Sequence, residues 1–402
     1  MSFQAKRELV AQVAPRYREG SRAEKSVILD EFVVATGYAR KYAIRVPTGP
    51  LREPAPLQRP RAPRYDNDVR DALAIAWAAT NRLCGKRLVP FLPELVPSLE
   101  RPGHLVLTEE VRALLLRLSP ATADRLLRPV RQPTRGVSTT KRGTLLKHQV
   151  PVRTFAQWDD VRPGFLEADS VAHCGGSIEG AYLHTLTLTD VATGWTECLA
   201  LLHRTQHAVL QALDQARRRL PFPLLGLDTD NGGEFLNEGL LAYCEREAIT
   251  FTRGRAYRSN DQCFVEQKNG SIVRQLVGYD HFEGERAYRQ LTELYRAVRL
   301  DVNFFQPSMK LRRKQRTGAR VQRTYDTAQT PFRRLVASGV LADGARERLE
   351  AIVQALDPVR LLRQIEALQN ALWQLAVFRS PGAVASVPTA TTTSRASGPT
   401  AN

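Results

Sequence analysis

The chain has 402 residues, of which 43% are hydrophobic, so it is long and apolar enough to form several ordinary buried cores. Its formal net charge of +17 indicates a polyanionic partner, because such an excess repels itself unless phosphates neutralise it. The lack of a long apolar run excludes a membrane span, and the charged N-terminus excludes a signal peptide, so we expect a cytoplasmic, nucleoid-associated protein.

Residues 1–46 are predicted to hold a helix-turn-helix that binds DNA. Within them, residues 21–45 show an apolar helical face, a break at Gly37 and a second, basic helix. Three residues of that second helix suit a major groove and phosphates: Arg40, Lys41 and Arg45. Residues 47–66 are too rich in proline for a helix or an inner strand, which predicts a semi-rigid linker.

A second helical block is expected over residues 67–131. Its last helix begins at the Ser-Pro pair 119–120, an N-cap followed by proline in the first turn. This helix carries Arg125 and Arg128, so a second DNA-binding helix-turn-helix is predicted. Residues 132–160 are polar, basic and rich in turns, which indicates an extended connector along phosphates.

The pattern changes to strands at residues 161–300. Three runs of alternating β-branched and aromatic residues predict an antiparallel meander. A helix, a strand, a helix, a short strand and a helix over residues 260–277 follow. This order indicates an α/β fold, with a mixed five-stranded sheet and covering helices. The centre of the chain is also mildly acidic between two basic flanks, as expected of a metal-dependent core between DNA-binding arms.

The remainder is predicted to form basic and helical elements. Residues 301–340 read as a small basic β element with a hairpin turn at 317–318, and residues 341–379 as a helical segment broken at an Asp-Pro pair. Residues 380–402 are rich in Ala, Thr, Ser and Pro and are expected to be disordered. The basic residues of the β element that we expect to contact DNA are Lys310, Arg312 and Arg313.

The stretch TDNGGEF, residues 229–235, follows an apolar run and has two interpretations. Asn-Gly and Gly-Gly form turns readily, and Asp230 at a strand end can also hold a metal. Two further acids occupy positions where a charge is costly unless it is paired or metal-bound. Asp169 lies in the middle of an apolar strand. Glu266 lies on a predicted helix, and 35 residues separate it from Asp230.

The two aspartates, the DNG turn and the later glutamate, in β-β-β-α-β-α order, resemble the retroviral-integrase-type core of the DDE transposases. Longer strings, among them TDVATGWTE and VNFFQPSMKL, are similar to transposases of bacterial insertion sequences. The resemblance implies an RNase H-like fold and two Mg²⁺ ions, replaceable by Mn²⁺, held by Asp169, Asp230 and Glu266. It further implies cleavage of DNA 3′ ends and strand transfer, acting on terminal inverted repeats and target DNA as a homo-multimer.

The resemblance also carries over further DNA-contacting positions. Tyr257 and Gln262 match residues near DNA ends, and Lys268 and Arg274 fall on the DNA-facing helix. The chain departs from the family at RSNDQCFV, where many relatives carry Pro and Gly, and at Gly270 inside the catalytic helix. It also lacks the His/Cys zinc module of retroviral integrases.

Several alternatives remain open at this stage. Asp228 faces the same side of its strand as Asp230 and is the rival ligand, and Glu234 reads as a helix-start acid beside the site. An inactive, transposase-derived DNA-binding regulator would keep the core as a scaffold. A plain RNase H-like nuclease would cleave without joining strands.

Overall fold

The structure is a computed structural model that describes residues 1, 3–49, 65–131, 162–230, 232–235, 237–253 and 262–377. The expectations for Tyr257, for the connector 132–160 and for the tail 380–402 lie outside these residues. The contacts divide the chain into two units, Met1–Arg64 and Tyr65–Asn402.

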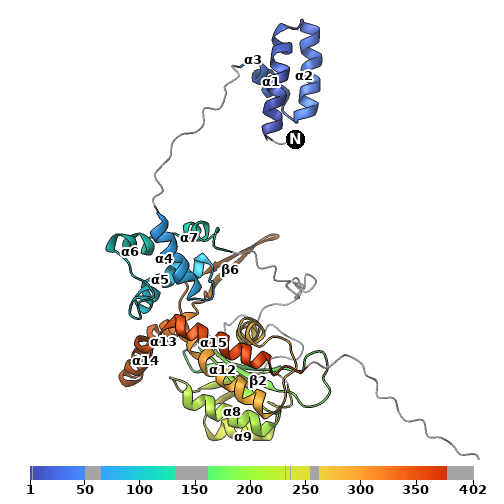
Figure 1. The fold of residues 1–402 in the computed structure, drawn as a ribbon. Helices are drawn as coiled ribbons and strands as arrows, with labels where there is room; N and C mark the ends of the chain where they lie inside the picture. Colours follow the sequence, from blue (N-terminus) through green and yellow to red (C-terminus); the bar gives the residue numbers. More distant parts are fainter. Residues whose placement is uncertain are drawn as a thin grey trace, which may run out of the picture. The chain divides into compact units, whose positions relative to one another are not determined.

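The described part of the first unit contains α1 (Phe3–Glu19), α2 (Arg22–Thr36) and α3 (Arg40–Thr48), seen in Figure 1. A capping box starts α2, because the Ser21 side chain accepts the backbone N–H of Glu24 while the Glu24 carboxylate accepts that of Ser21. Gly37, with φ of 70°, ends α2 as expected. Helix α1 was not among the expected elements, since it contains Pro15, which normally disfavours a helix interior.

The second unit begins with four helices, α4 (Asn67–Ala78), α5 (Gly85–Glu100), α6 (Glu109–Leu116) and α7 (Pro120–Leu126). Their apolar faces meet in a core that includes the fully buried side chains of Leu73, Leu88, Leu92, Leu95 and Leu115. The predicted start of α7 is confirmed, because the Ser119 hydroxyl accepts the backbone N–H of Thr122 at 3.2 Å.

A mixed five-stranded sheet follows, with the order β3-β2-β1-β4-β5. Its strands are β1 (Phe165–Ala172), β2 (His184–Asp190), β3 (Thr196–Leu201), β4 (Gly226–Thr229) and β5 (Thr250–Arg253). Strands β1, β2 and β3 form the expected antiparallel meander, while β4 pairs parallel to β1 and β5 parallel to β4. This α/β arrangement with β1 at the centre is RNase H-like and confirms the expected fold class.

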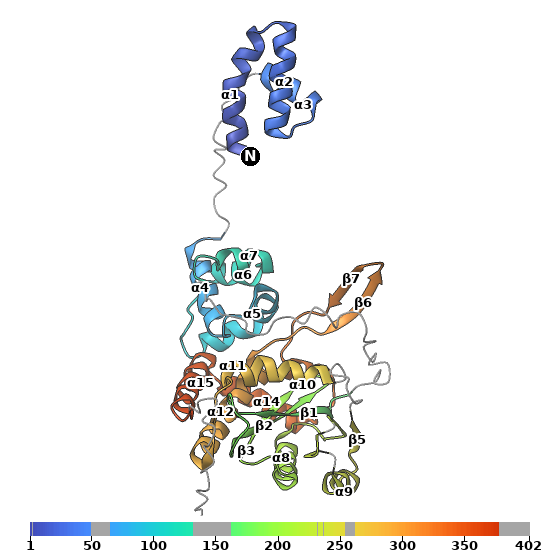
Figure 2. The same cartoon turned by 90° about the vertical axis from the view of Figure 1, so that its right-hand side faces the viewer.

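Helices cover both faces of the sheet, as Figure 2 shows. Helices α8 (Gln206–Arg219) and α9 (Glu238–Arg246) lie on one face, and α10 (Cys263–Lys268) lies on the other. The predicted continuous helix over 260–277 is interrupted, since a π-helical turn at Asn269–Val273 separates α10 from α11 (Arg274–Leu276). Such turns occur frequently at functional sites, and this one contains Gly270.

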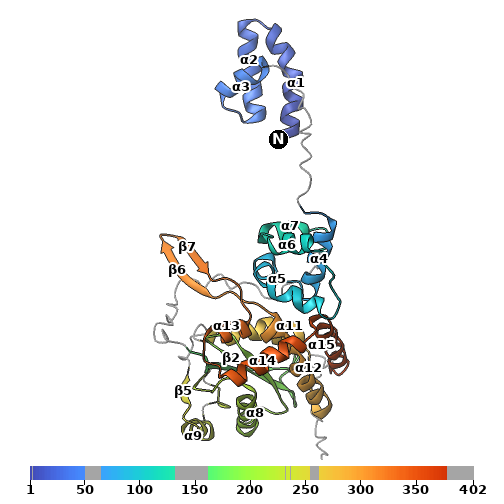
Figure 3. The same cartoon turned by 90° about the vertical axis from the view of Figure 1, so that its left-hand side faces the viewer.

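The C-terminal part joins a hairpin and four helices to the sheet. Helix α12 (Gly284–Phe305) leads into β6 (Leu311–Thr317) and β7 (Arg320–Tyr325), which pair antiparallel and extend away from the sheet in Figure 3. Helices α13 (Pro331–Ala337), α14 (Asp343–Ala355) and α15 (Pro358–Trp373) follow, and α15 packs along α12. The expected break at Asp357 is confirmed, because its carboxylate caps α15.

The second helical block makes direct contacts with the C-terminal helices of the second unit. The Gln306 side chain donates to the carbonyl of Thr80 at 3.4 Å, and Arg101 donates to the carbonyl of Val353 at 3.1 Å. His104 and the Asp357 carboxylate lie 2.8 Å apart. The helices α4 to α7 therefore belong to the same unit as the sheet. None of the helices described in the structure has the length and apolarity that a membrane crossing requires.

Candidate active site

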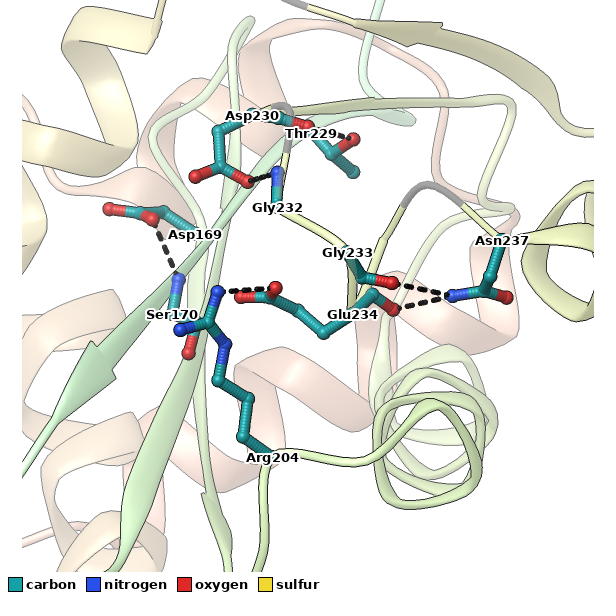
Figure 4. A network of polar contacts seen from close by, with 9 residues as sticks. All are labelled: Asp169, Ser170, Arg204, Thr229, Asp230, Gly232, Gly233, Glu234 and Asn237. Atoms are coloured by element: carbon teal, nitrogen blue, oxygen red, sulfur yellow. Dashed lines mark hydrogen bonds and ion pairs between the residues drawn. The ribbon is translucent and has the colours of Figure 1, made fainter. Parts of the chain in front are cut away.

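Asp169 lies on β1, and Asp230 directly follows the parallel neighbouring strand β4. In the register of β1 and β4, Ala168 lies beside Thr229, so the next residue on each chain is one of these aspartates. Figure 4 shows their carboxylates on the same side, with Glu234 close by. The strand pairing thus brings together two acids that are far apart in the sequence.

The carboxyl group of Asp169 is held in an environment that disfavours its charge. Burial raises its pKa, and the neighbouring carboxylates of Asp230 and Glu234 raise it further. Two hydrogen bonds act in the opposite direction, one from the backbone N–H of Ser170 and one from the Asn269 side chain, each at 2.7 Å. Such surroundings favour the binding of a cation near Asp169, because a cation offsets the repulsion between its carboxylate and those of Asp230 and Glu234.

Glu266 lies on α10, which covers this face of the sheet. Burial raises its pKa, and the carboxylate of Asp169 adds to the rise. Asp169 is therefore electrostatically coupled to both Asp230 and Glu266. The three acids that the sequence singled out are gathered on one face of the fold.

The donor chemistry of these acids fits a hard divalent cation, since carboxylate oxygens are the ligands that Mg²⁺ takes from proteins. Within the described ranges, no group of three His, Cys, Asp or Glu side chains is close enough to hold a metal ion. Asp169 is coupled to its two partners pairwise, and the assignment of all three acids as ligands of two Mg²⁺ ions stays a prediction.

A second acidic pair, Glu167 and Asp228, lies two residues earlier on the same strands. The two are partners in the parallel register, and the Glu167 carboxylate accepts the backbone N–H groups of Phe264 and Val265 at 2.8 and 2.9 Å. Burial raises the pKa of Glu167 to about 8, and Asp228 and Glu266 contribute to the rise. This pair holds the start of α10 against the sheet.

Asp228 and Asp230 thus have different surroundings. The Asp228 carboxylate accepts the Thr252 hydroxyl at 2.6 Å and the Gln262 amide at 3.3 Å. The Asp230 carboxylate, within the described part of the chain, accepts the backbone N–H of Gly232 at 2.9 Å. The carboxylates that raise the pKa of Asp169 are those of Asp230 and Glu234. These contacts favour Asp230 over Asp228 as the partner of Asp169.

Two side chains beside the site were not predicted in these roles. The Asn269 amide donates to Asp169 and orients it; the signal available in the sequence was its spacing, three residues after Glu266 on one helix. Glu234, expected at a helix start, instead forms an ion pair with Arg204 at 2.5 Å, as Figure 4 shows. Helix α9 is capped by Asn237, whose side chain accepts the N–H of Leu240 at 2.9 Å.

Three of the expected DNA-contacting residues lie partly or wholly inside the protein, and their contact with DNA stays a prediction. Gln262 is 7% exposed and bonds to Asp228. The Lys310 ammonium donates to the carbonyls of Val191 and Ala192, and burial lowers its pKa to about 8. Burial likewise lowers the pKa of Lys268 to about 8.

The other described basic residues that the sequence proposed for DNA lie at the surface. Arg274 is half-buried, donates to the carbonyl of Gly278 at 3.3 Å and lies over the Tyr279 ring. Arg40 is exposed and ion-paired with Asp30. The remaining exposed residues are Lys41, Arg45, Arg125, Arg128, Arg312 and Arg313.

The fold and the site define an RNase H-like α/β protein with an acidic face on its central strands. The chain belongs to the same family as the uncharacterized protein y4rM of Sinorhizobium fredii (strain NBRC 101917 / NGR234), with 49% identity over 336 residues, which cover 83% of this chain and 96% of that protein. No protein-family model matches the chain.

Two kinds of solved structure are similar to part of the chain. The catalytic core domain of BIV integrase is 17% identical, with 44% of this chain and 95% of that chain covered and a TM-score of 0.30. The catalytic core domain of HTLV-2 integrase in complex with magnesium, in its dimeric form, is 18% identical. The match covers 36% of this chain and 90% of that chain, with a TM-score of 0.28.

Proposed function

We propose that the chain is a DDE-type transposase that cleaves the 3′ ends of an insertion sequence and joins them to target DNA. The observation that carries this proposal is the coupling of Asp169, on the central strand of an RNase H-like sheet, to Asp230 after β4 and to Glu266 on α10. Carboxylates that lie close together beside a rigid sheet repel one another and are costly unless a ligand uses them. A divalent cation is the ligand that suits carboxylate oxygens.

In this proposal Asp169, Asp230 and Glu266 hold two Mg²⁺ ions, for which Mn²⁺ can substitute. When bound, such ions lower the pKa of an attacking water or DNA hydroxyl and stabilise the leaving 3′ oxygen. The protein orients the ligands, because Asn269 fixes the Asp169 carboxylate and the Gly232 N–H fixes that of Asp230. The Glu167 and Asp228 pair fixes the helix that carries Glu266.

Double-stranded DNA is the proposed partner, and the placement of charge supports this. Every residue of β6 is exposed, and four of them are basic: Arg312, Arg313, Lys314 and Arg316. A two-stranded basic arm of this kind can follow a groove or a phosphate backbone. Helix α3 and helix α7 carry further exposed basic residues, and the joining of two DNA ends favours a homo-multimer assembled on DNA.

A strand-cleavage assay on the DNA that flanks this reading frame tests the proposal. With the purified full chain, we expect a nick that leaves a 3′-hydroxyl, followed by joined products, in Mg²⁺ or Mn²⁺, and neither product when EDTA removes the metal. Duplexes of scrambled sequence serve as the control.

Two outcomes would contradict the proposal. Specific binding of the flanking DNA without any cleavage in either metal would favour the DNA-binding regulator. Cleavage of all duplexes without joining would favour a plain nuclease.

A further inference from the structure

A cavity of about 620 Å³ lies between the C-terminal end of α8, the helix α12 and the helix α14. Its volume is within the range of small-molecule sites. Five arginines from these three helices line it: Arg218, Arg219, Arg296, Arg299 and Arg348. A concave site with so many guanidinium groups is suited to an anion.

The acids near the cavity neutralise only part of this charge. Three of the arginines have carboxylate partners within 2.7 Å, namely Arg218 with Asp214, Arg296 with Glu293 and Arg299 with Glu197. Neither Arg219 nor Arg348 has an ion-pair partner among the residues that the structure describes. Two guanidinium groups, one from α8 and one from α14, are therefore left for a ligand.

The half-buried Arg219 shows that the arginines repel one another. Burial lowers its pKa, Glu197 opposes this, and the positive charges of Arg299 and Arg296 lower the pKa further. The backbone carbonyl of Arg219 also accepts a hydrogen bond from the Arg299 side chain at 2.8 Å, which holds the Arg299 guanidinium beside the end of α8. An anion in the cavity would relieve this repulsion.

The remaining walls of the cavity are apolar. They come from the same three elements and from the segment after α8: Leu220, Pro221, Leu300, Leu349 and Ile352. Ile352 is 36% exposed and thus presents an uncovered apolar surface beside the arginines. The cavity therefore offers both a cationic side and a surface on which a flat ring can lie.

The cavity is separate from the acids of the candidate active site. Helix α8, which supplies two of the arginines, lies on the face of the sheet opposite to α10, which carries Glu266 (Figure 2). Whatever binds at the acids is therefore on the other side of the sheet from the cavity.

We propose that this cavity binds a nucleoside polyphosphate, with the arginines on the phosphate chain and the apolar wall against the base. The planar guanidinium fork matches phosphate oxygens in pairs, and these charge-assisted bonds are among the strongest in proteins. A phosphate chain concentrates several negative charges within the reach of Arg219 and Arg348, whereas an acidic peptide spreads them over a longer segment. The base accounts for the apolar side, which a simple inorganic anion would leave bare.

Isothermal titration of the full chain with ATP, GTP and inorganic triphosphate tests this site. We expect saturable ATP or GTP binding, and a Kd at least tenfold higher for the double variant Arg219→Gln/Arg348→Gln. The matched control, Arg289→Gln/Arg346→Gln, removes two exposed charges outside the cavity and should change the Kd less than twofold. Thermal unfolding of each variant separates loss of binding from loss of fold.

The apolar wall is tested separately by Ile352→Ser. We expect this change to weaken nucleotide binding several-fold and to leave triphosphate binding unchanged, because only the base contacts the wall. The proposal is overturned if neither nucleotide binds, if the Arg219 and Arg348 variant binds as well as the unchanged protein, or if only duplex DNA competes for the site. All of these results are independent of DNA cleavage.

Discussion

Replacing Asp230 by Asn should abolish DNA cleavage while DNA binding is kept. Asparagine has nearly the same shape, so the turn at Gly232 can form, but one of the charged ligands of the proposed metal site is lost. We expect the rate of nicking to fall by at least about 10³-fold, equivalent to roughly 4 kcal/mol of transition-state stabilisation. The measurement is single-turnover cleavage of the flanking duplex, with binding followed separately by fluorescence anisotropy.

The matched control for this variant is Asp228→Asn. It removes the same charge two residues earlier on the same strand, from an acid that contacts Thr252 and Gln262. We expect it to lower the rate by about 10- to 100-fold, as for residues that act through a ligand. Equal losses in the two variants, or a larger loss for Asp228→Asn, would show that the ligand has been assigned to the wrong aspartate.

Removing the charge of the β6–β7 hairpin should weaken DNA binding strongly and make it less dependent on salt. A variant with Gln in place of four exposed residues of β6 tests this: Arg312, Arg313, Lys314 and Arg316. If each contacts one phosphate, the slope of log K against log salt should decrease by about 3 to 4, and affinity near physiological salt by about 10²- to 10³-fold.

A second variant controls for the change in net charge. It replaces four exposed arginines of the C-terminal helices and α12 by Gln: Arg289, Arg346, Arg360 and Arg363. This variant has the same net charge as the hairpin variant, so it should keep nearly the full slope if the hairpin is the DNA-binding arm. Equal slopes for both variants would mean that the hairpin has no special part in DNA binding.

The elements that the sequence predicted correctly depend on local signals. Capping chemistry within a few residues accounts for three of them: the start of α7 at Ser119, the end of α2 at Gly37 and the break before α15. The meander follows from alternation along three short runs. Asp169 and Asp230 could be singled out because one interrupts an apolar strand and the other directly follows one.

The features that the sequence did not reveal are contacts between distant parts of the chain. Lys310 lies among basic residues in the sequence, but its ammonium meets carbonyls of the turn between β2 and β3, 118 and 119 residues earlier. Gln306 reaches Thr80 across 226 residues, which joins two segments that composition separates. No local pattern encodes such pairings, because they depend on which surfaces the completed sheet and helices present to one another.

The most direct test of the proposed metal site is a crystal structure of the chain soaked in Mn²⁺, whose anomalous signal locates the ion. We expect a peak between the carboxylates of Asp169 and Asp230, with Glu266 turned toward it, and no peak at that place in the Asp230→Asn variant. A peak held instead by Glu167 and Asp228, or no ordered Mn²⁺ on this face of the sheet, would contradict the proposal that these three acids form a catalytic site.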